Sequence, residues 1–283
     1  MSDARHSPER EELPETEGSV AESDTATDAP TLVGTDLTIG YDTEPIVECD
    51  HVVLPAGEVT ALVGPNGSGK STLLKALSGQ LAPWTGQVEL DGENVYGMGK
   101  KALARRLALL SQEHDSPSTT TVEALVQYGR YPHRGFLEGL SADDLAAVDR
   151  AIELAGVEQF RHSELGELSG GQKQLAWIAM TLAQDPDLLL LDEPTTFLDL
   201  QHQLGVLETV RTLNRERGVT VGIVLHDIAQ AARYADNIIA LQDGTPYDWG
   251  PPADVVTEEL LAAVFGVDAT VREGPEIVPH RPL

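Results

Sequence analysis

Short apolar runs bounded by turn-forming residues begin at Thr31 and predict a series of strands. Each run ends close to Gly, Pro, Asp or Asn, as is typical of strands buried in a sheet. The third run leads directly into a glycine-rich segment at 64–71. The predicted strands cover residues 32–39, 46–54, 58–63, 87–90, 107–110, 187–191, 219–225, 238–241 and 245–249.

Helical periodicity appears between these strands and is clearest just after Asp199. Five apolar residues form a single stripe at helical spacing there, namely Leu200, Leu204, Leu207, Val210 and Leu213. Gly218 follows and supplies a C-terminal cap. The other predicted helices are the one opened by 64–71 and ending near 78, then 121–128, 142–155, 172–184, 228–234 and 255–265.

Apolar strands that alternate with helices predict an α/β fold with a parallel sheet covered on both faces. The first strands are separated by short turns, which predicts an N-terminal antiparallel β lobe. The region 115–184 is mainly helical and is expected to form an inserted α-helical lobe. Residues 1–31 are polar, acidic and poor in aromatic residues, so we expect a disordered tail followed by one domain over 32–283.

Acidic residues dominate the chain, with 46 Asp and Glu against 19 Lys and Arg and a net charge of -27. Residues 1–31 hold nine of the acids and two of the bases, so residues 32–283 are acidic as well. We interpret this dispersed excess as the solvated surface of a protein from a high-salt cytoplasm, where screening removes the self-repulsion. The alternative interpretation is that the acidic surface binds a basic partner. The sequence shows no basic stripe, which argues against nucleic acid as a partner.

One cysteine, Cys49, excludes an internal disulfide and a cysteine-based metal site, and it indicates a reducing compartment. No apolar run approaches the length of about 18 residues that a membrane helix needs. The acidic N-terminus has no apolar core and does not resemble a signal peptide. If this protein functions at a membrane, we therefore expect it to bind a partner that spans the membrane.

The glycine-rich segment fits the phosphate-binding pattern G-x-x-x-x-G-K-[ST] between a buried strand and a helix. Glycines allow backbone N–H groups to surround phosphates, and the positive end of the following helix faces the same anion. We expect Lys70 to reach the β- and γ-phosphates of ATP and the Ser71 hydroxyl to ligate Mg²⁺. The expected nucleotide-binding residues here are Gly64, Pro65, Asn66, Gly67, Ser68, Gly69, Lys70, Ser71 and Thr72.

Two further segments complete the expected ATP site. Asp192 and Glu193 end the buried strand 187–191, where Asp192 can hold Mg²⁺ and Glu193 can polarise the attacking water. Ser169, Gly170, Gly171 and Gln172 open a capped helix that could approach an anion. One nucleotide does not need two such helix ends from one chain, so we expect the second to face a γ-phosphate held by another copy.

The sequence Leu168-Ser-Gly-Gly-Gln172, lying between the phosphate loop and Leu188-Leu-Leu-Leu-Asp-Glu-Pro194, resembles the ATPase subunit of ABC transporters. The resemblance covers about residues 32–249 and implies a P-loop, RecA-like core. It also implies that the subunit works as a head-to-tail dimer, expected to be a homodimer, with each ATP between one phosphate loop and the partner's residues 169–171. Hydrolysis then requires closure of the dimer.

The same resemblance assigns the remaining site residues. Tyr41 matches the aromatic residue that stacks on adenine, and Asp199 matches an aspartate at the dimer seam. Gln112 matches a glutamine that senses Mg²⁺ and the γ-phosphate, and His226 matches the switch histidine that contacts the γ-phosphate. The implied catalytic residues are Glu193, His226 and Gln112, and the implied Mg²⁺ residues are Ser71, Gln112 and Asp192.

Several stretches, including Tyr128-Gly-Arg-Tyr-Pro-His133 and 225–236, resemble importers of iron–siderophores, haem and cobalamin. The resemblance implies peripheral attachment to the cytoplasmic face of the membrane through permease subunits, and an indirect link to a substrate-binding protein. We expect a ferric siderophore as cargo, with cobalamin second and haem third. Arg130 and His133 are interpreted as interface or lobe residues rather than iron ligands.

Two other functions remain open on the sequence alone. A soluble ABC ATPase that acts on ribosomes, DNA or a cluster-assembly scaffold would share the ATP site, although those that act on ribosomes or DNA usually carry two cassettes or zinc-binding insertions in one chain. An unrelated P-loop kinase or GTPase would leave residues 169–172 and His226 as coincidences. Dimerisation that depends on ATP would separate this last class from the other two.

Overall fold

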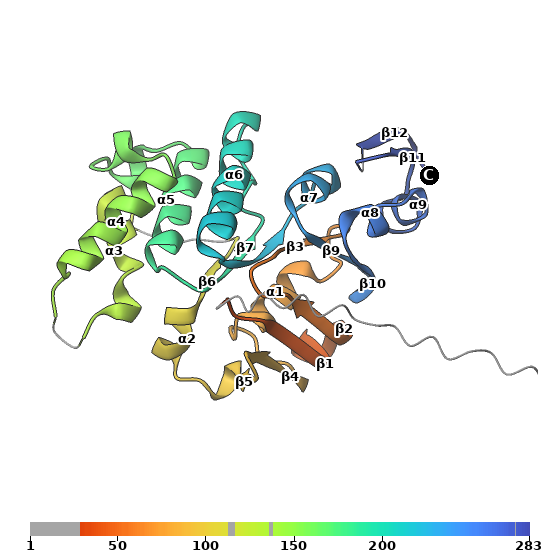
Figure 1. The fold of residues 1–283 in the computed structure, drawn as a ribbon, viewed down its shortest axis with the longest axis horizontal. Helices are drawn as coiled ribbons and strands as arrows, with labels where there is room; N and C mark the ends of the chain where they lie inside the picture. The colour runs from red at the N-terminus through yellow and green to blue at the C-terminus, as the bar shows by residue number, and fades with distance from the viewer. Residues whose placement is uncertain (1–28, 113–116, 136–137, 275) are drawn as a thin grey trace, which may run out of the picture.

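The computed structural model describes residues 29–112, 117–135, 138–274 and 276–283. A central sheet runs through the molecule, with an antiparallel sheet beside it and a group of helices at one side (Figure 1). The expected α/β class is confirmed. The predicted disorder at 1–28 lies outside the described residues. Pro30 and Thr31, which we expected in the tail, are held by hydrogen bonds from Thr220 Oγ1 to Pro30 O and from Thr31 N to Asp91 Oδ1.

The core sheet has the strand order β10-β9-β3-β8-β7-β6. Neighbouring strands from β9 to β6 are parallel, and β10 pairs antiparallel with β9. All residues of β3, β7 and β8 are buried, as expected for parallel strands covered on both faces. The bounds are β3 Val59–Val63, β6 Leu107–Leu110, β7 Leu188–Asp192, β8 Thr220–Val224, β9 Asn237–Gln242 and β10 Thr245–Gly250.

The predicted antiparallel lobe is the sheet β2-β1-β4-β5. Helix α1, Lys70–Leu77, contacts β1 and β2 of this sheet and β7 and β8 of the core sheet. Buried leucines on α1 therefore join the two sheets in one apolar cluster, which holds the phosphate loop between them. The strands are β1 Leu32–Tyr41, β2 Glu44–Leu54, β4 Thr85–Leu90 and β5 Glu93–Asn94.

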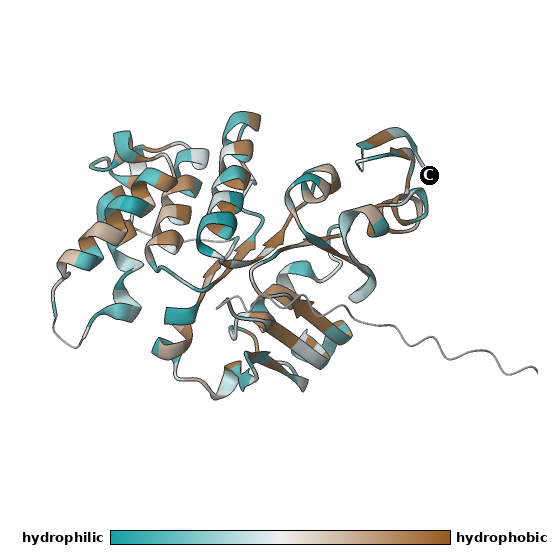
Figure 2. Cartoon of the chain, in the orientation of Figure 1, coloured by the Kyte–Doolittle hydropathy of each residue, from teal (hydrophilic) through white to brown (hydrophobic). Residues whose placement is uncertain are grey.

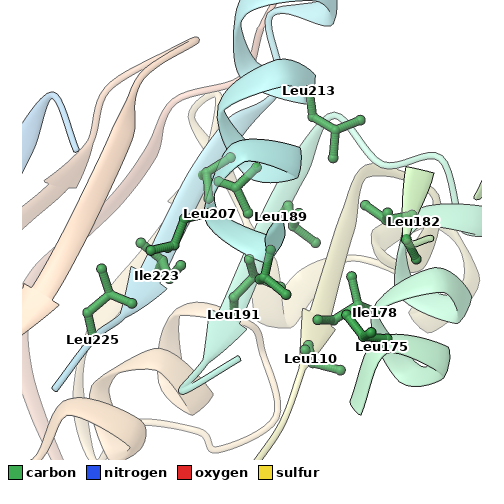
Figure 3. Packing of buried hydrophobic residues seen from close by; sticks show 14 of the residues in the cluster. Leu110, Leu175, Ile178, Leu182, Leu189, Leu191, Leu207, Leu213, Ile223 and Leu225 are labelled. Carbon is green, nitrogen blue, oxygen red and sulfur yellow. The ribbon is translucent and has the colours of Figure 1, made fainter. Parts of the chain in front are cut away.

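Helices α6, Leu200–Arg217, and α7, Ile228–Tyr234, follow β7 and β8 as crossover helices. Figure 3 shows Leu207 and Leu213 of α6 directed toward Leu189 of β7 and Ile223 of β8. These side chains are buried in the larger apolar cluster. Figure 2 shows brown central strands and helices that are teal on parts of their surface, which is the pattern of a covered sheet.

The predicted helical lobe contains α3 Val122–Tyr128, α4 Ala142–Leu154 and α5 Gly170–Ala183. Helix α5 packs against both α3 and α4. Thr121 and Ser141 cap α3 and α4 with their side-chain oxygens, and Asp144 completes a capping box with Ser141. The short 3₁₀ turns are η1 Val95–Gly97, η2 Tyr131–His133, η3 Glu158–Phe160 and η4 Leu165–Glu167.

The structure corrects the prediction for the end of the chain. Residues 255–265 do not form one helix, because α8 Pro252–Val255 ends and α9 Glu258–Phe265 begins after Thr257. The Thr257 side chain accepts a hydrogen bond from Leu260 N and caps the second helix. The hairpin of β11 Val267–Arg272 and β12 Glu276–Pro282 was not predicted, nor was α2 Lys100–Arg106.

Arg130 is a buried structural residue of the helical lobe. Its Nε donates to Asp144 Oδ1 at 2.8 Å, and its Nη1 donates to Ala183 O at 2.8 Å. The two paired side chains are 8% and 9% exposed. Arg130 therefore ties the end of α3 to α4 and α5. His133 lies at the same junction, with its Nε2 2.7 Å from Gln184 O.

We expect Arg130→Met to destabilise the chain by about 3–5 kcal/mol, because it leaves the Asp144 carboxylate buried without its partner. Burial raises the pKa of Asp144, but hydrogen bonds from Ser141 and Arg130 outweigh burial and lower this pKa to about 2. The carboxylate thus stabilises the fold above the ordinary pKa of 3.8, and this contribution is lost as pH falls toward 2.

Urea unfolding near pH 7 measures the effect, with Arg150→Met on exposed α4 surface as the matched control. The control should change the unfolding free energy by less than about 0.5 kcal/mol. Equal stability of the two variants would contradict the structural role of Arg130.

Candidate functional site

The phosphate loop connects β3 to α1 in a conformation that depends on glycine. Gly64 has φ 146°, and Gly69 has φ 94°. A Cβ on Gly64 would lie 2.2 Å from Leu241 O, and a Cβ on Gly69 would lie 2.5 Å from Val47 Cγ2. Both positions therefore require glycine for conformation and for space. Gly67 has φ 81° but faces open space.

Lys70 is a buried cation enclosed by the phosphate loop. Its Nζ donates to Gly64 O at 3.0 Å and to Pro65 O at 2.9 Å, and the residue is 5% exposed. Burial lowers the pKa of Lys70, while the nearby charges of Glu193 and Asp192 oppose that shift. The buried Ser68 Oγ has no hydrogen-bond partner within the described part of the chain. A cation and a spare hydroxyl in one loop fit the phosphate groups of a nucleotide.

Asp192 ends β7 directly opposite the start of α1. Its Oδ1 accepts a hydrogen bond from Ser71 Oγ at 2.8 Å, and Asp192 is 2% exposed. Burial raises the pKa of Asp192, and the hydrogen bond from Ser71 opposes the rise. A hydroxyl and a carboxylate oxygen side by side fit the oxygen-ligand preference of Mg²⁺, which takes one or two carboxylates together with substrate phosphates. The described residues contain no cluster of three or more His, Cys, Asp or Glu that could hold a metal alone.

Glu193 is the point at which three segments of the site converge. Its Oε2 accepts from Gln112 Nε2 at 2.9 Å, lies 2.6 Å from His226 Nε2, and accepts from Thr196 Oγ1 at 3.3 Å. Glu193 is 8% exposed and has φ 50°, which is unusual for a residue other than glycine. A buried carboxylate with one fixed oxygen is suited to orient and deprotonate a water molecule.

Several of these residues line an open cleft of about 610 Å³ beside the phosphate loop. The cleft therefore unites the phosphate loop, the end of β7, the residue after β6 and the residue after β8. Its walls are formed by Ile46, Asn66, Gly67, Gly69, Lys70, Ser71, Thr72, Gln112, Glu193 and His226.

Gly64, Pro65, Ser68 and Asp192 belong to the phosphate loop and the end of β7 but do not line the cleft, and neither do Tyr41, Asp199 and residues 169–172. Tyr41 lies at the end of β1 and is 45% exposed. Asp199 caps α6 by accepting from His202 N at 3.0 Å, and this bond lowers the pKa of the Asp199 carboxyl. Residues 169–172 open α5, where Ser169 and Gln172 form a reciprocal capping box. Ser169 and Gly170 are exposed, so this helix start is open to a partner.

Sequence reasoning missed two residues, one that contacts Glu193 and one that lines the cleft. Thr196 lies in the loop after β7 and contacts Glu193. Its position three residues beyond Glu193 was the available signal, since turns commonly bring side chains at this spacing together. Ile46 belongs to β2 and gave only the signal of an apolar strand residue.

Residues 50–196 match the model of the ABC transporter family. The chain is 44% identical over 252 residues to the achromobactin transport ATP-binding protein CbrD of Dickeya dadantii, covering 89% of this chain and 93% of that protein. It is also 44% identical over 253 residues to the ferric enterobactin transport ATP-binding protein FepC of Escherichia coli, covering 88% and 93%.

Two solved structures extend the comparison to the fold. A metal-chelate type ABC transporter in an inward-facing conformation superposes with a TM-score of 0.74 at 27% identity, covering 90% of this chain and 98% of that one. A dimeric ATP-binding cassette, MJ0796, in a post-hydrolysis state with ADP and phosphate gives a TM-score of 0.70 at 25% identity, covering 78% and 98%.

We expect Gly64→Ala to weaken ATP binding by about 100-fold or more, because the loop must move to relieve both the clash with Leu241 O and the left-handed strain. Gly67→Ala carries only the strain of about 1–2 kcal/mol and should weaken binding by roughly tenfold. Titration with a fluorescent ATP analogue measures both, and thermal unfolding verifies that each variant is folded. A Gly67 variant that binds as weakly as the Gly64 variant would refute the steric explanation.

Proposed function

The chain belongs to the ABC transporter ATP-binding family, and from this membership we propose that it energises the import of ferric siderophores through a membrane permease. As a member of the family it binds ATP and hydrolyses it to ADP and phosphate. The similarity to CbrD and FepC carries the choice of cargo, because it extends over nearly the whole chain at 44% identity. Cobalamin and haem remain the second and third choices.

We propose that Glu193 acts as the general base of hydrolysis. Gln112, His226 and Thr196 all contact the same carboxylate oxygen, which fixes the direction in which the carboxylate faces. Lys70 and the loop amides bind the phosphates, and His226 and Gln112 hold the position of the water and the transferred phosphate. When bound, Mg²⁺ neutralises developing charge on the phosphates, and Ser71 and Asp192 are the residues that would hold it.

We further propose that two copies of the chain share each ATP. The supporting observation is that the open helix start at 169–172 and the exposed Phe197, at 85%, lie outside the cleft of their own chain. Homologous ATP-binding cassettes form dimers, and homologous subunits assemble into ABC transporters. In this arrangement Ser169 and Asp199 contribute to the site of the partner, and Tyr41 stacks on adenine.

Membrane attachment would come from the permease. No helix in the described residues is long and apolar enough to cross a bilayer. We propose a peripheral position on the cytoplasmic face, with an indirect link to a substrate-binding protein. A soluble ABC ATPase outside transport remains the alternative, and it is disfavoured by the likeness to a chain of a metal-chelate type ABC transporter.

Uptake of radioactive iron tests the transport function directly. Cells that lack this chain should lose uptake of ferric siderophore, and the wild-type chain should restore it while Glu193→Gln should not. Uptake of labelled cobalamin in the same cells is the control for cargo. Loss of cobalamin uptake with intact siderophore uptake would overturn the choice of cargo, and no loss of either would favour the soluble alternative.

Glu193→Gln should lower kcat for ATP hydrolysis by about 100-fold to 10,000-fold, which is the range for loss of a general base. Binding of ATP should change by less than about threefold, because the carboxylate acts on the transition state. Phosphate release in single-turnover assays measures the effect, with Glu216→Gln on exposed α6 surface as the control. Full activity of the Glu193 variant would remove it from the mechanism.

Ser71→Ala should raise the Mg²⁺ concentration for half-maximal hydrolysis by about tenfold or more, since Mg²⁺ loses one of its few protein ligands. Ser78→Ala is the matched control, because Ser78 caps the other end of the same helix through Lys75 O. A Mg²⁺ titration of turnover gives both values. An unchanged requirement in the Ser71 variant would place the Mg²⁺ ligand elsewhere.

A further inference from the structure

The turn that follows β7 carries backbone strain at two positions. Glu193 has φ 50° and Phe197 has φ 65°, a left-handed conformation that residues other than glycine rarely adopt. Strain of this kind persists only where the surrounding structure holds the backbone in place. The groups that hold this turn therefore help to determine the geometry of Glu193.

Hydrogen bonds within the turn connect Glu193 to Leu198 in two steps. Thr196 N donates to Glu193 O at 3.2 Å, and the Thr196 hydroxyl donates to the Glu193 carboxylate at 3.3 Å. Leu198 N donates to Thr195 O at 3.3 Å. A displacement of Leu198 would therefore be passed to the Glu193 carboxylate through the two threonines.

Two glutamine side chains hold the far end of the turn. Gln203 Nε2, near the start of α6, donates to Leu198 O at 3.0 Å. Gln230 Nε2, in the first turn of α7, donates to Gln203 Oε1 at 3.1 Å. Both glutamines are half-buried, and Leu198 is buried. We define Gln203 and Gln230 as the glutamine relay.

The glutamine relay has a fixed direction. A backbone carbonyl can only accept a hydrogen bond, so the Gln203 amide must turn its nitrogen toward Leu198 O. The oxygen of the same amide then faces Gln230, whose Nε2 supplies the donor. Removal of the Gln230 amide therefore weakens the hold on Leu198 O, and removal of the Gln203 amide abolishes it.

Gln230 joins the relay to the segment that carries His226. Asp227 directly follows His226 and caps α7, with its Oδ1 accepting from Gln230 N at 3.4 Å. His226 Nε2 in turn lies 2.6 Å from Glu193 Oε2. The segments that follow β7 and β8 are therefore joined at two places, once by the contact between His226 and Glu193 and once by the glutamine relay.

We propose that Gln203 and Gln230 are positioning residues for ATP hydrolysis, which fix the direction of the Glu193 carboxylate. Neither residue lines the cleft, so each acts through Glu193. Such a role affects the rate strongly, because a displacement of about 1 Å at a reacting group can cost about 100-fold. The relay consists of uncharged amide groups, so a high salt concentration does not screen it.

This inference rests on the proposed role of Glu193 as general base, and it adds the groups that orient that base. ATP hydrolysis in two backgrounds tests it on the full chain. Gln203→Met and Gln230→Met keep the length of the side chain and remove its hydrogen bonds, and each is made in the wild type and in Glu193→Gln. Gln242→Met is the matched control, because Gln242 Nε2 also donates to a backbone carbonyl, Ala263 O, at 3.0 Å and lies outside the cleft.

In the wild type, Gln203→Met should lower kcat by about 10-fold to 100-fold. Gln230→Met should lower kcat by a smaller factor, because Gln203 still donates to Leu198 O. KM should change by less than about threefold in both variants, since the phosphate loop is intact. In Glu193→Gln, addition of Gln203→Met should cost less than about threefold, because residues that act through one group are not additive.

Single-turnover phosphate release measures these rates, and thermal unfolding verifies that each variant is folded. The control should match the wild type. An unchanged kcat in Gln203→Met would overturn the proposal. An equal loss in both backgrounds would also overturn it, because the relay would then act independently of Glu193, for example through Asp199. Full activity of Glu193→Gln itself would instead refute the proposed general base, and the relay with it.

Discussion

Burial of the parallel strands β3, β6, β7 and β8 on both faces is the constraint on which the site depends. Parallel strands end at the same edge, so the residues that follow them must meet there. Gly64, Gln112, Glu193 and His226 each lie within two residues of a strand end. The apolar clusters that cover the sheet fix this alignment, and the cleft takes its shape from it.

At this edge of the sheet, one chain places charged side chains where the phosphates of one nucleotide would lie. The opposite side of that nucleotide is left open by the same chain. Lys70 and Glu193 are both buried, and each is held by groups of its own chain. By contrast, the helix start at Ser169 is capped by its own side chain and is exposed at the surface of the chain. On the proposed shared site, a closing partner would complete it and would link hydrolysis to the motion of two subunits.

The sequence predicted the core sheet and most of the cleft because their signals are local. A glycine pattern specifies the phosphate loop, and apolar runs specify buried strands. It did not predict α2, whose short run of Lys, Ala, Leu and Arg has no apolar stripe and no buried residue. The β11–β12 hairpin was also missed, because β11 packs against α9 and periodicity does not show that contact. The break at Thr257 was missed although a threonine N-cap is a local signal. Thr196 was missed because its role comes from a turn after Glu193.

The molecular mass of Glu193→Gln protein in solution, with and without ATP and Mg²⁺, tests the shared site most directly. Slow hydrolysis should allow the ATP-bound state to persist, so light scattering should show a monomer without ATP and a dimer with it. Adding Ser169→Arg, which places a bulky side chain at the open helix start, should return the protein to a monomer in ATP. A Glu193→Gln protein that stays monomeric with ATP, or a dimer that survives Ser169→Arg, would contradict a site shared between two copies.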